Sequence, residues 1–476
     1  MQLTMKFGGT SVGSAAAIRR TVELVGQQVD EGHQVVVVVS AMGIRPVKVT
    51  DLLLQGAHAA VADDAEKPRE IAALLRQVHQ EAIAGVVEEG ELRQALLAEI
   101  DAFVRRFSDL CGAVRVLGEL TPRALDAIAG MGEQMAARIV AAALQTTGRP
   151  AAAVDATALI VTDAGFQDAT PLVEETASHI EATLPPLLAA NTIPVVTGFI
   201  AATPDGITTT LGRGGSDYTA ALLGRALASD EVWIWTDVDG VMSADPRLVP
   251  EAHTIRALTY REVGELAYYG ARVLHPRTIR PCVEAGIPLR IKNTFHPENP
   301  GTLIVADGSP EASNGAMKAV TAIGSQSLIS LEGNGMLGIP GIAARTFSAV
   351  ARQGVNVLLI SQASSEQSIC FSVPGSSATT VIGALEDEFA GEFRRRDMDR
   401  VWALEPVAIV TVVGAGMRGT PGIAGRLFSA LGNAGINIIA IAQGSSECSI
   451  SLVVDEADTR DAVQEIHNLL QVVPAR

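Results

Sequence analysis

Short apolar runs alternate with stretches of helical spacing along the first 295 residues. The runs are nearly continuous and rich in Val, Ile and Ala, which is typical of strands buried on both faces. They fall at residues 3–7, 35–39, 151–154, 193–200 and 231–236. Between them, apolar residues recur every three or four positions, as in amphipathic helices. The alternation predicts an α/β domain with an open, mostly parallel sheet flanked by helices and ending near residue 295.

The longest helical patterns cover residues 14–30, 51–118 and 122–144. Thr121 and Pro122 mark the start of the last one, because threonine caps a helix N-terminus and proline suits its first turn. The chain therefore has a long helical insert before its next strands.

After about residue 318 the chain repeats itself. Residues 333–369 match residues 414–450 at a constant offset of 81, without a gap. Each copy reads as strand, Gly/Pro loop, helix, strand, turn and strand, which predicts two small modules of the same α/β type. The expected domains are therefore 1–295, a linker at 296–318, and modules at 319–400 and 401–476.

Both modules contain the glycine spacing of a dinucleotide-binding loop, at residues 333–338 and 414–419. The context differs from that of such a loop, since Pro340 and Pro421 separate the glycines from the helix that they should open. No acidic residue ends the strand that follows. The glycines therefore indicate a tight turn in each repeat.

Composition narrows the class of protein. The 476 residues are 48% hydrophobic and 4% aromatic, and the formal net charge of −17 disfavours nucleic acid as a partner. No apolar run approaches the roughly 20 residues that span a bilayer. The four cysteines lie far apart, so neither a zinc site nor a disulfide framework is expected, and a cytoplasmic location fits.

Three glycine-rich or acidic loops follow predicted strands. In residues 6–12 a lysine, two glycines and two hydroxyls precede a helix, which suits a phosphate group, although an ordinary turn is the alternative. In residues 211–218 Arg213 can grip a carboxylate and Asp217 can orient a cation. Asp237 and Asp239 suit ribose or a metal-bound nucleotide, or else simple turn chemistry.

Taken together, residues 6–12, 212–218, 236–240, 245–247 and 270–276 resemble the aspartate kinases of the amino-acid kinase fold. The repeats resemble the paired ACT regulatory domains, of βαββαβ type, of the same enzymes. The resemblance covers essentially the whole chain. It extends to the kinase portion of fused aspartokinase–homoserine dehydrogenases, so we expect the chain to end where a dehydrogenase half would begin and to lack that activity.

The resemblance implies phosphoryl transfer from ATP, with Mg²⁺, to L-aspartate. Lys6 and Asp217 would be catalytic. The substrate would be held by Ser40, Thr50, Glu133, Arg213 and Ser216. The nucleotide would be held by Lys6, Gly8, Gly9, Thr236, Asp237, Asp239, Arg247 and Arg272. No protein-bound metal is expected beyond the ion that accompanies ATP.

The repeats would bind an amino-acid effector, threonine ahead of lysine, in this first step of the lysine, threonine and methionine pathway. The expected contacts are Met336, Asn356, Gln362, Met417, Asn437 and Gln443. A homodimer through the ACT modules, or a tetramer, is also expected. A purely structural dimerisation module is the alternative.

Two positions depart from the family pattern, Met242 where tyrosine is common and Arg272 where lysine is usual. Two rival functions stay open. One is a kinase for glutamate or N-acetylglutamate, against which Glu133 argues because it suits a free amino group. The other is an amino-acid sensor whose kinase half is inactive.

Overall fold

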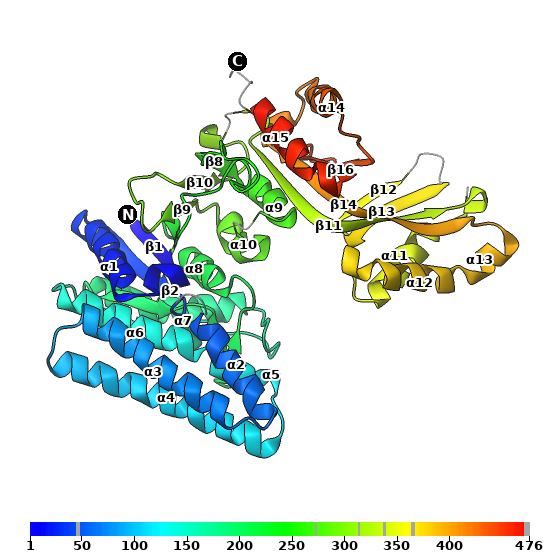
Figure 1. The fold of residues 1–476 in the computed structure, drawn as a ribbon. Coiled ribbons are helices and arrows are strands. Elements are labelled where there is room, and N and C mark those ends of the chain that lie inside the picture. The colour runs from blue at the N-terminus through cyan, green and yellow to red at the C-terminus, as the bar shows by residue number, and fades with distance from the viewer. Residues whose placement is uncertain (44–47, 272–273, 313–314, 337–338, 363–366, 471–476) are drawn as a thin grey trace. The chain divides into compact units, whose positions relative to one another are not determined.

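The computed structural model divides into two compact units (Figure 1). One unit comprises Met1–Val241, Arg256–Tyr260 and Leu274–Ala306, and the other comprises Met242–Ile255, Arg261–Val273 and Asp307–Arg476. The residues described are 1–43, 48–271, 274–312, 315–336, 339–362 and 367–470.

The first unit is built on an eight-stranded sheet of order β3-β4-β2-β1-β7-β9-β10-β8. Its strands are β1 (Gln2–Phe7), β2 (Gln34–Val39), β3 (Ala151–Val154), β4 (Ile193–Thr197), β7 (Glu231–Thr236), β8 (Ala257–Thr259), β9 (Leu289–Asn293) and β10 (Thr302–Val305). All neighbours are parallel except β9 and β10. A separate hairpin pairs β5 (Ile200–Ala202) with β6 (Thr208–Thr210). The sheet confirms the predicted fold class.

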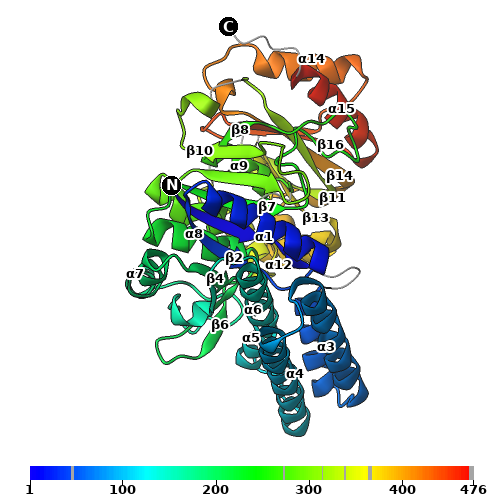
Figure 2. The ribbon, with the colours of Figure 1, turned by 90° about the vertical axis from the view of Figure 1, so that its left-hand side faces the viewer.

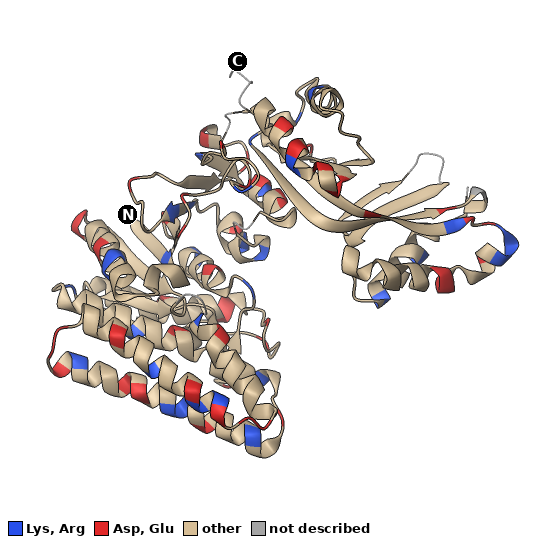
Figure 3. Cartoon of the chain, viewed as in Figure 1, with Lys and Arg blue, Asp and Glu red and all other residues tan. Residues whose placement is uncertain are grey.

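Two groups of helices cover this sheet. One group is α1 (Ala15–Asp30), α2 (Val49–Val61), α3 (Glu66–Val86), α4 (Glu91–Leu117), α5 (Pro122–Ala129) and α6 (Met131–Thr146). The other is α7 (Val173–Ala189), α8 (Gly215–Ala226) and α10 (Pro276–Ala285). In the first group α1 and α6 pack on the sheet, while α3 and α4 lie side by side outside them (Figure 2). Charged residues of both signs follow α3 and α4 (Figure 3), as expected for a solvated outer layer.

Local sequence signals account for most of these elements. The Val-rich strand β2 is buried from its second residue onward, and the Thr121 hydroxyl accepts the Ala124 N–H as the predicted cap of α5. The prediction of a single helix over 122–144 is wrong, because the helix is interrupted at Gly130, between α5 and α6. A Cβ there would lie 2.6 Å from Ile200. The expected linker at 296–318 also contains strand β10, which pairs with β8 and β9.

The second unit carries both repeats on one six-stranded sheet of order β12-β13-β11-β14-β16-β15. Its strands are β11 (Ala319–Glu332), β12 (Leu359–Gln362), β13 (Ser368–Pro374), β14 (Arg400–Val413), β15 (Ala440–Gln443) and β16 (Ser449–Asp455). Its helices are α9 (Tyr260–Tyr268), which starts at the end of the first unit's range, α11 (Ile342–Arg352), α12 (Ala378–Glu388), α13 (Ala390–Arg395), α14 (Ile423–Asn433) and α15 (Thr459–Leu470).

The two central strands, β11 and β14, are shared between the repeats. They pair antiparallel along their whole length. Val320, early in β11, lies in the core of the second module, whereas Val401, its equivalent in β14, packs on the core of the first. Each repeat therefore completes its core with the opening half-strand of the other.

Asn356 and Asn437, two of the predicted effector contacts, do not lie on strands. They are exposed and precede β12 and β15, which start at Leu359 and Ala440. The strands start later because the first ladder bonds on this side, from the N–H groups of residues 358 and 439, lie beyond the asparagines. Among the described helices, none is both long enough and apolar enough to cross a membrane.

Candidate active site

A cavity of about 1030 Å³ opens in the first unit, where strands β1, β2 and β7 end. Parallel sheets commonly bind ligands at the carboxyl ends of their strands. Eleven of the residues predicted for the catalytic centre line this cavity: Lys6, Gly8, Gly9, Ser40, Thr50, Glu133, Arg213, Ser216, Asp217, Thr236 and Asp237. Residues from distant parts of the sequence therefore line one cavity.

Lys6 and Asp217 form an ion pair inside the cavity. Lys6 is near the end of β1, and Asp217 is in the first turn of α8. The Lys6 Nζ and Asp217 Oδ1 atoms are 2.6 Å apart, and both side chains are at most 16% exposed. Such a pair holds a lysine ammonium at one point in the cavity, where it can meet an anion.

The Gly8–Gly9 turn brings the backbone close to two neighbouring strands. The Gly8 N–H donates to the carbonyl oxygen of Trp235 at 3.0 Å. A Cβ at Gly9 would lie 2.9 Å from the carbonyl oxygen of Ala41, while the Gly43 N–H donates to the Gly9 oxygen at 2.8 Å. Glycine is thus required at position 9 by close backbone contact.

Glu133 is a buried carboxylate that faces the cavity from the first turn of α6. Its Oε1 atom accepts the Ala41 N–H at 3.1 Å, and its Oε2 atom has no hydrogen-bond partner among the described residues. The side chain is 4% exposed, and this burial raises the pKa of Glu133 to about 8. An incoming cation would supply the missing partner and favour the ionised carboxylate.

Arg213 lies on a turn between two glycines with left-handed backbone, Gly212 (φ +71°) and Gly214 (φ +72°). The turn exposes Arg213 at the cavity wall, and its guanidinium makes no ion pair with any described residue. Ser216 follows, buried in the first turn of α8. A free guanidinium beside a helix N-terminus is suited to a carboxylate.

Two of the predicted nucleotide residues, Asp239 and Arg247, lie outside this cavity's lining. Asp239 accepts hydrogen bonds from Asn293 Nδ2 at 2.6 Å and from the His296 ring at 3.2 Å. Arg247 belongs to the second unit and pairs with Asp245 at 2.6 Å. Arg272 lies outside the described residues. Their roles stay predictions.

Other cavity residues were missed in the sequence. Lys48 lies two positions before the predicted Thr50, so a search for cations near that threonine finds it. Phe199 has a positive φ of 69° that no sequence pattern announces. Asp126 and Gln167 carry no motif at all.

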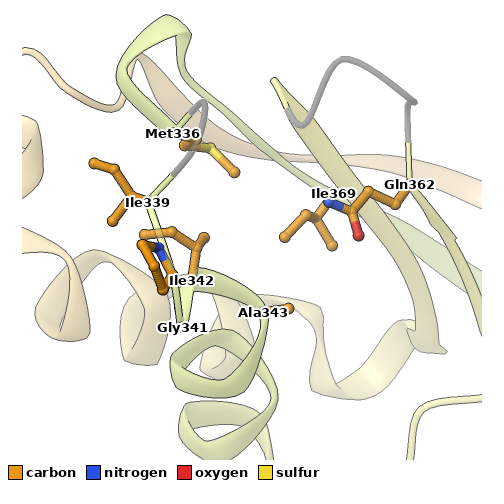
Figure 4. Close-up of a pocket in the computed structure, with 8 residues that line it drawn as sticks. Met336, Ile339, Gly341, Ile342, Ala343, Gln362 and Ile369 are labelled. Atoms are coloured by element: carbon orange, nitrogen blue, oxygen red, sulfur yellow. The ribbon is translucent and has the colours of Figure 1, made fainter.

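The first repeat contains a smaller cavity, of about 310 Å³ (Figure 4). Its lining is Met336, Ile339, Pro340, Gly341, Ile342, Ala343, Gln362 and Ile369. Figure 4 shows Gln362 and Ile369 facing the side of Met336 and Ile342 across the cavity. Two predicted effector contacts, Met336 and Gln362, therefore line one cavity, whereas Asn356 is not part of its lining. The lining residues carry no charge.

The corresponding residues of the second repeat match those of the first in exposure, since Met336 is also buried in its module's core and Asn356 and Gln362 are also exposed. Met417 is buried in the core of that module, and Asn437 and Gln443 are exposed. The nearby Gly419 N–H donates to Glu447 Oε2 at 3.0 Å. Within the part of the chain that the structure describes, no group of three or more His, Cys, Asp or Glu side chains could hold a metal ion.

Comparisons of the sequence and of the structure with known proteins all lead to the same family. Residues 1–293 match the model of the amino acid kinase family, and residues 329–389 and 410–470 match an ACT domain. A chloroplastic bifunctional aspartokinase/homoserine dehydrogenase of Daucus carota is 37% identical over 97% of this chain and 50% of its own length. The chain thus spans about half the length of such bifunctional relatives.

Single-function relatives match over most of their length. An aspartokinase of Schizosaccharomyces pombe is 32% identical over 98% of this chain and 92% of its own. The structure of E. coli aspartokinase III in complex with aspartate and ADP superimposes with a TM-score of 0.78 at 28% identity, covering 99% of this chain and 100% of that one. The same protein in complex with lysine and aspartate gives 0.77 at 29% identity, covering 98% and 99%. The chain therefore belongs to the amino acid kinase family, in its aspartokinase branch with paired ACT domains.

Proposed function

We propose that this chain is an aspartate kinase that transfers the γ-phosphoryl group of ATP to the side-chain carboxylate of L-aspartate. The products are ADP and 4-phospho-L-aspartate. The observation that carries the proposal is one cavity that holds the Lys6–Asp217 pair together with the Arg213 guanidinium and the Glu133 Oε2 atom, neither of which has a partner among the described residues. These groups match the charges of an amino acid on one side and of a phosphate chain on the other.

Glu133 and Arg213 would orient the aspartate. Glu133 Oε2 accepts hydrogen bonds from the α-ammonium group. It is suited to this group because no described donor uses its lone pairs and the residue is buried. Arg213 takes the α-carboxylate with two parallel hydrogen bonds. Ser40, Thr50 and Ser216 line the same cavity and contribute hydroxyl groups. The side-chain carboxylate is thereby directed toward Lys6.

Phosphoryl transfer then depends on position and charge. The attacking carboxylate is already ionised at neutral pH, so no general base is required. Lys6, held by Asp217, offsets the charge that develops on the transferring group. The Gly9 amide would approach the phosphate oxygens, since the Gly8 N–H already donates to Trp235. MgATP enters as the substrate, and the metal compensates further charge between the phosphates. Thr236 and Asp237 line the same cavity and would contact the nucleotide.

The cavity of the first repeat would hold the effector. Threonine is placed ahead of lysine because the described lining combines apolar side chains with one amide, that of Gln362, which suits a methyl and a hydroxyl group. The Gln362 amide would bond the threonine hydroxyl, with Met336 and Ile342 against its methyl group. Effector binding would inhibit the kinase through the ACT modules of a homodimer or tetramer. The reaction would be the first step of lysine, threonine and methionine synthesis, in the cytoplasm. A purely structural role of the repeats is the alternative.

The test is a rate measurement with three acceptors. ADP release from MgATP is followed with L-aspartate, L-glutamate and N-acetyl-L-glutamate, and then with aspartate plus threonine or lysine. We expect turnover with aspartate alone, reduced by threonine. Turnover with an acetylated acceptor contradicts the assignment of Glu133. No turnover from protein that still binds threonine favours a sensor over a kinase.

A further inference from the structure

Asp126, an acidic residue of the large cavity's lining, accepts three hydrogen bonds from other groups of the protein. It lies on α5 and is 2% exposed. Its Oδ2 atom accepts the N–H groups of Gln167 at 2.9 Å and Thr210 at 3.0 Å, and its Oδ1 atom accepts the Thr210 hydroxyl at 2.8 Å. A side chain bonded in this way holds two separate segments of backbone to one helix.

Those two segments meet at the turn that presents Arg213. Thr210 ends strand β6 only three residues before Arg213. The Ala169 N–H, two residues after Gln167, donates to the Thr210 carbonyl oxygen at 2.9 Å, so the segments are also joined to each other. Asp126 therefore fixes the point at which the Arg213 turn begins.

The turn itself offers little resistance to displacement. Gly212 and Gly214 flank Arg213, and glycine has the widest backbone freedom of any residue. The Asp168 carboxylate supports the turn from one side, because a Cβ at Gly212 would lie 2.5 Å from Asp168 Oδ1. Asp168 adjoins Gln167, the other segment held by Asp126. The Asp168 carboxylate is itself paired with Arg277 at 2.7 Å, so Asp126 and Arg277 together fix this side of the turn.

We propose that Asp126 is a positioning residue that sets Arg213 for the α-carboxylate of the acceptor, and so determines how strongly an α-amino acid is preferred over an amine without that carboxylate. The proposal rests on the proposed aspartate kinase function. Misplacing a binding group by about 1 Å can cost on the order of 100-fold. Asp126 touches no substrate group in this account, and its effect passes through Arg213.

The probe that separates positioning from general support is β-alanine, which keeps the ammonium and the accepting carboxylate of aspartate but lacks the α-carboxylate. Asp126→Ala should raise the KM and the calorimetric Kd for aspartate about 10- to 100-fold. The Ki of β-alanine should change by less than about threefold, since β-alanine has no α-carboxylate for Arg213 to bind. Asp126→Asn should stay near wild type, because its amide oxygen can accept both N–H groups and its NH₂ can donate to Thr210.

The matched control is Asp155→Ala. Asp155 accepts hydrogen bonds from Arg138 and Gln134 but is not among the cavity's lining residues. It should leave the ratio of aspartate to β-alanine affinity unchanged. Asp126→Ala combined with Arg213→Ala should add less than about twofold to the effect of Arg213→Ala alone, because coupled residues are not additive.

Equal losses for aspartate and β-alanine, or full additivity with Arg213→Ala, would overturn the proposal. If Asp126→Ala does not fold, Thr210→Val decides, since it removes the hydroxyl bond to Oδ1 and nearly preserves volume. Thr210→Val should weaken the binding of aspartate but not that of β-alanine. An unchanged ratio of aspartate to β-alanine affinity would refute the proposal. If the wild-type protein shows no aspartate-dependent ADP release, the proposed function itself has failed, and this result is distinct from those of the variants.

Discussion

Aspartate binding should release a proton from Glu133. Burial raises the pKa of this carboxyl to about 8, so in the free protein at pH 7 it is mostly protonated. Only the ionised form can pair with the α-ammonium group of aspartate. Because ionisation accompanies binding, affinity should rise with pH, and the effect should fade above the pKa.

The magnitude follows from the ionised fraction. With a pKa of about 8, about a tenth of the protein is ionised at pH 7 and about three quarters at pH 8.5. The apparent Kd for aspartate is the intrinsic value divided by that fraction, so it should fall about eightfold between the two pH values. About 0.9 proton should leave for each aspartate bound at pH 7.

Isothermal titration calorimetry at pH 7 in two buffers of different ionisation enthalpy counts the protons directly. Glu133→Gln should bind aspartate more weakly and with a Kd independent of pH. Glu99→Gln is the matched control, since Glu99 pairs with Arg138 at 3.2 Å, is half-exposed and is not among the cavity's lining residues. A Kd that changes less than twofold from pH 7 to 8.5, with a binding enthalpy that is the same in both buffers, would refute the reasoning.

Three further predictions concern single side chains. Lys6→Ala should lower kcat by about 10³ or more without a large change in Tm, and a tenfold effect in steady-state kinetics would remove Lys6 from the reacting centre. Gly9→Ala should cost about 1–3 kcal/mol in urea unfolding, because its Cβ would lie 2.9 Å from the Ala41 oxygen, whereas Gly112→Ala, with no atom in the way, should cost nothing. His79 is fully buried with a pKa lowered to about 4, so the unfolded chain binds the proton first, and stability should fall by about 2 kcal/mol from pH 7 to pH 5. His79→Leu should reduce that pH dependence by this amount, and an unchanged slope of the unfolding free energy against pH would contradict the assignment.

Local patterns in the sequence predict the sheet and the glycine turn that follows β1. The Val-rich run of β2 and the Thr121 cap are readable because burial on two faces and capping each demand particular residue types. The Lys6 loop can be recognised in the sequence because a lysine and two glycines lie within four residues of one another. In such places one short segment contains the whole physical reason for the structure.

The remaining features depend on partners that are distant in the sequence. Asp126 lies in an ordinary helical pattern, and its importance comes from Gln167 and Thr210, 41 and 84 residues away. The exchange of half-strands between the repeats was equally hidden, since both copies have the same apolar pattern and either pairing satisfies it. Gly130 is needed at the junction of α5 and α6 because Ile200 leaves no room for a Cβ there.

The central claim is the identity of the acceptor group, and trapping the product with hydroxylamine tests it most directly. Protein, MgATP, L-aspartate and hydroxylamine are incubated, and the hydroxamate is compared with ADP. The account predicts aspartate β-hydroxamate in an amount equal to the ADP released, and none from Lys6→Ala. Release of ADP without hydroxamate, or at a rate independent of aspartate, would contradict it.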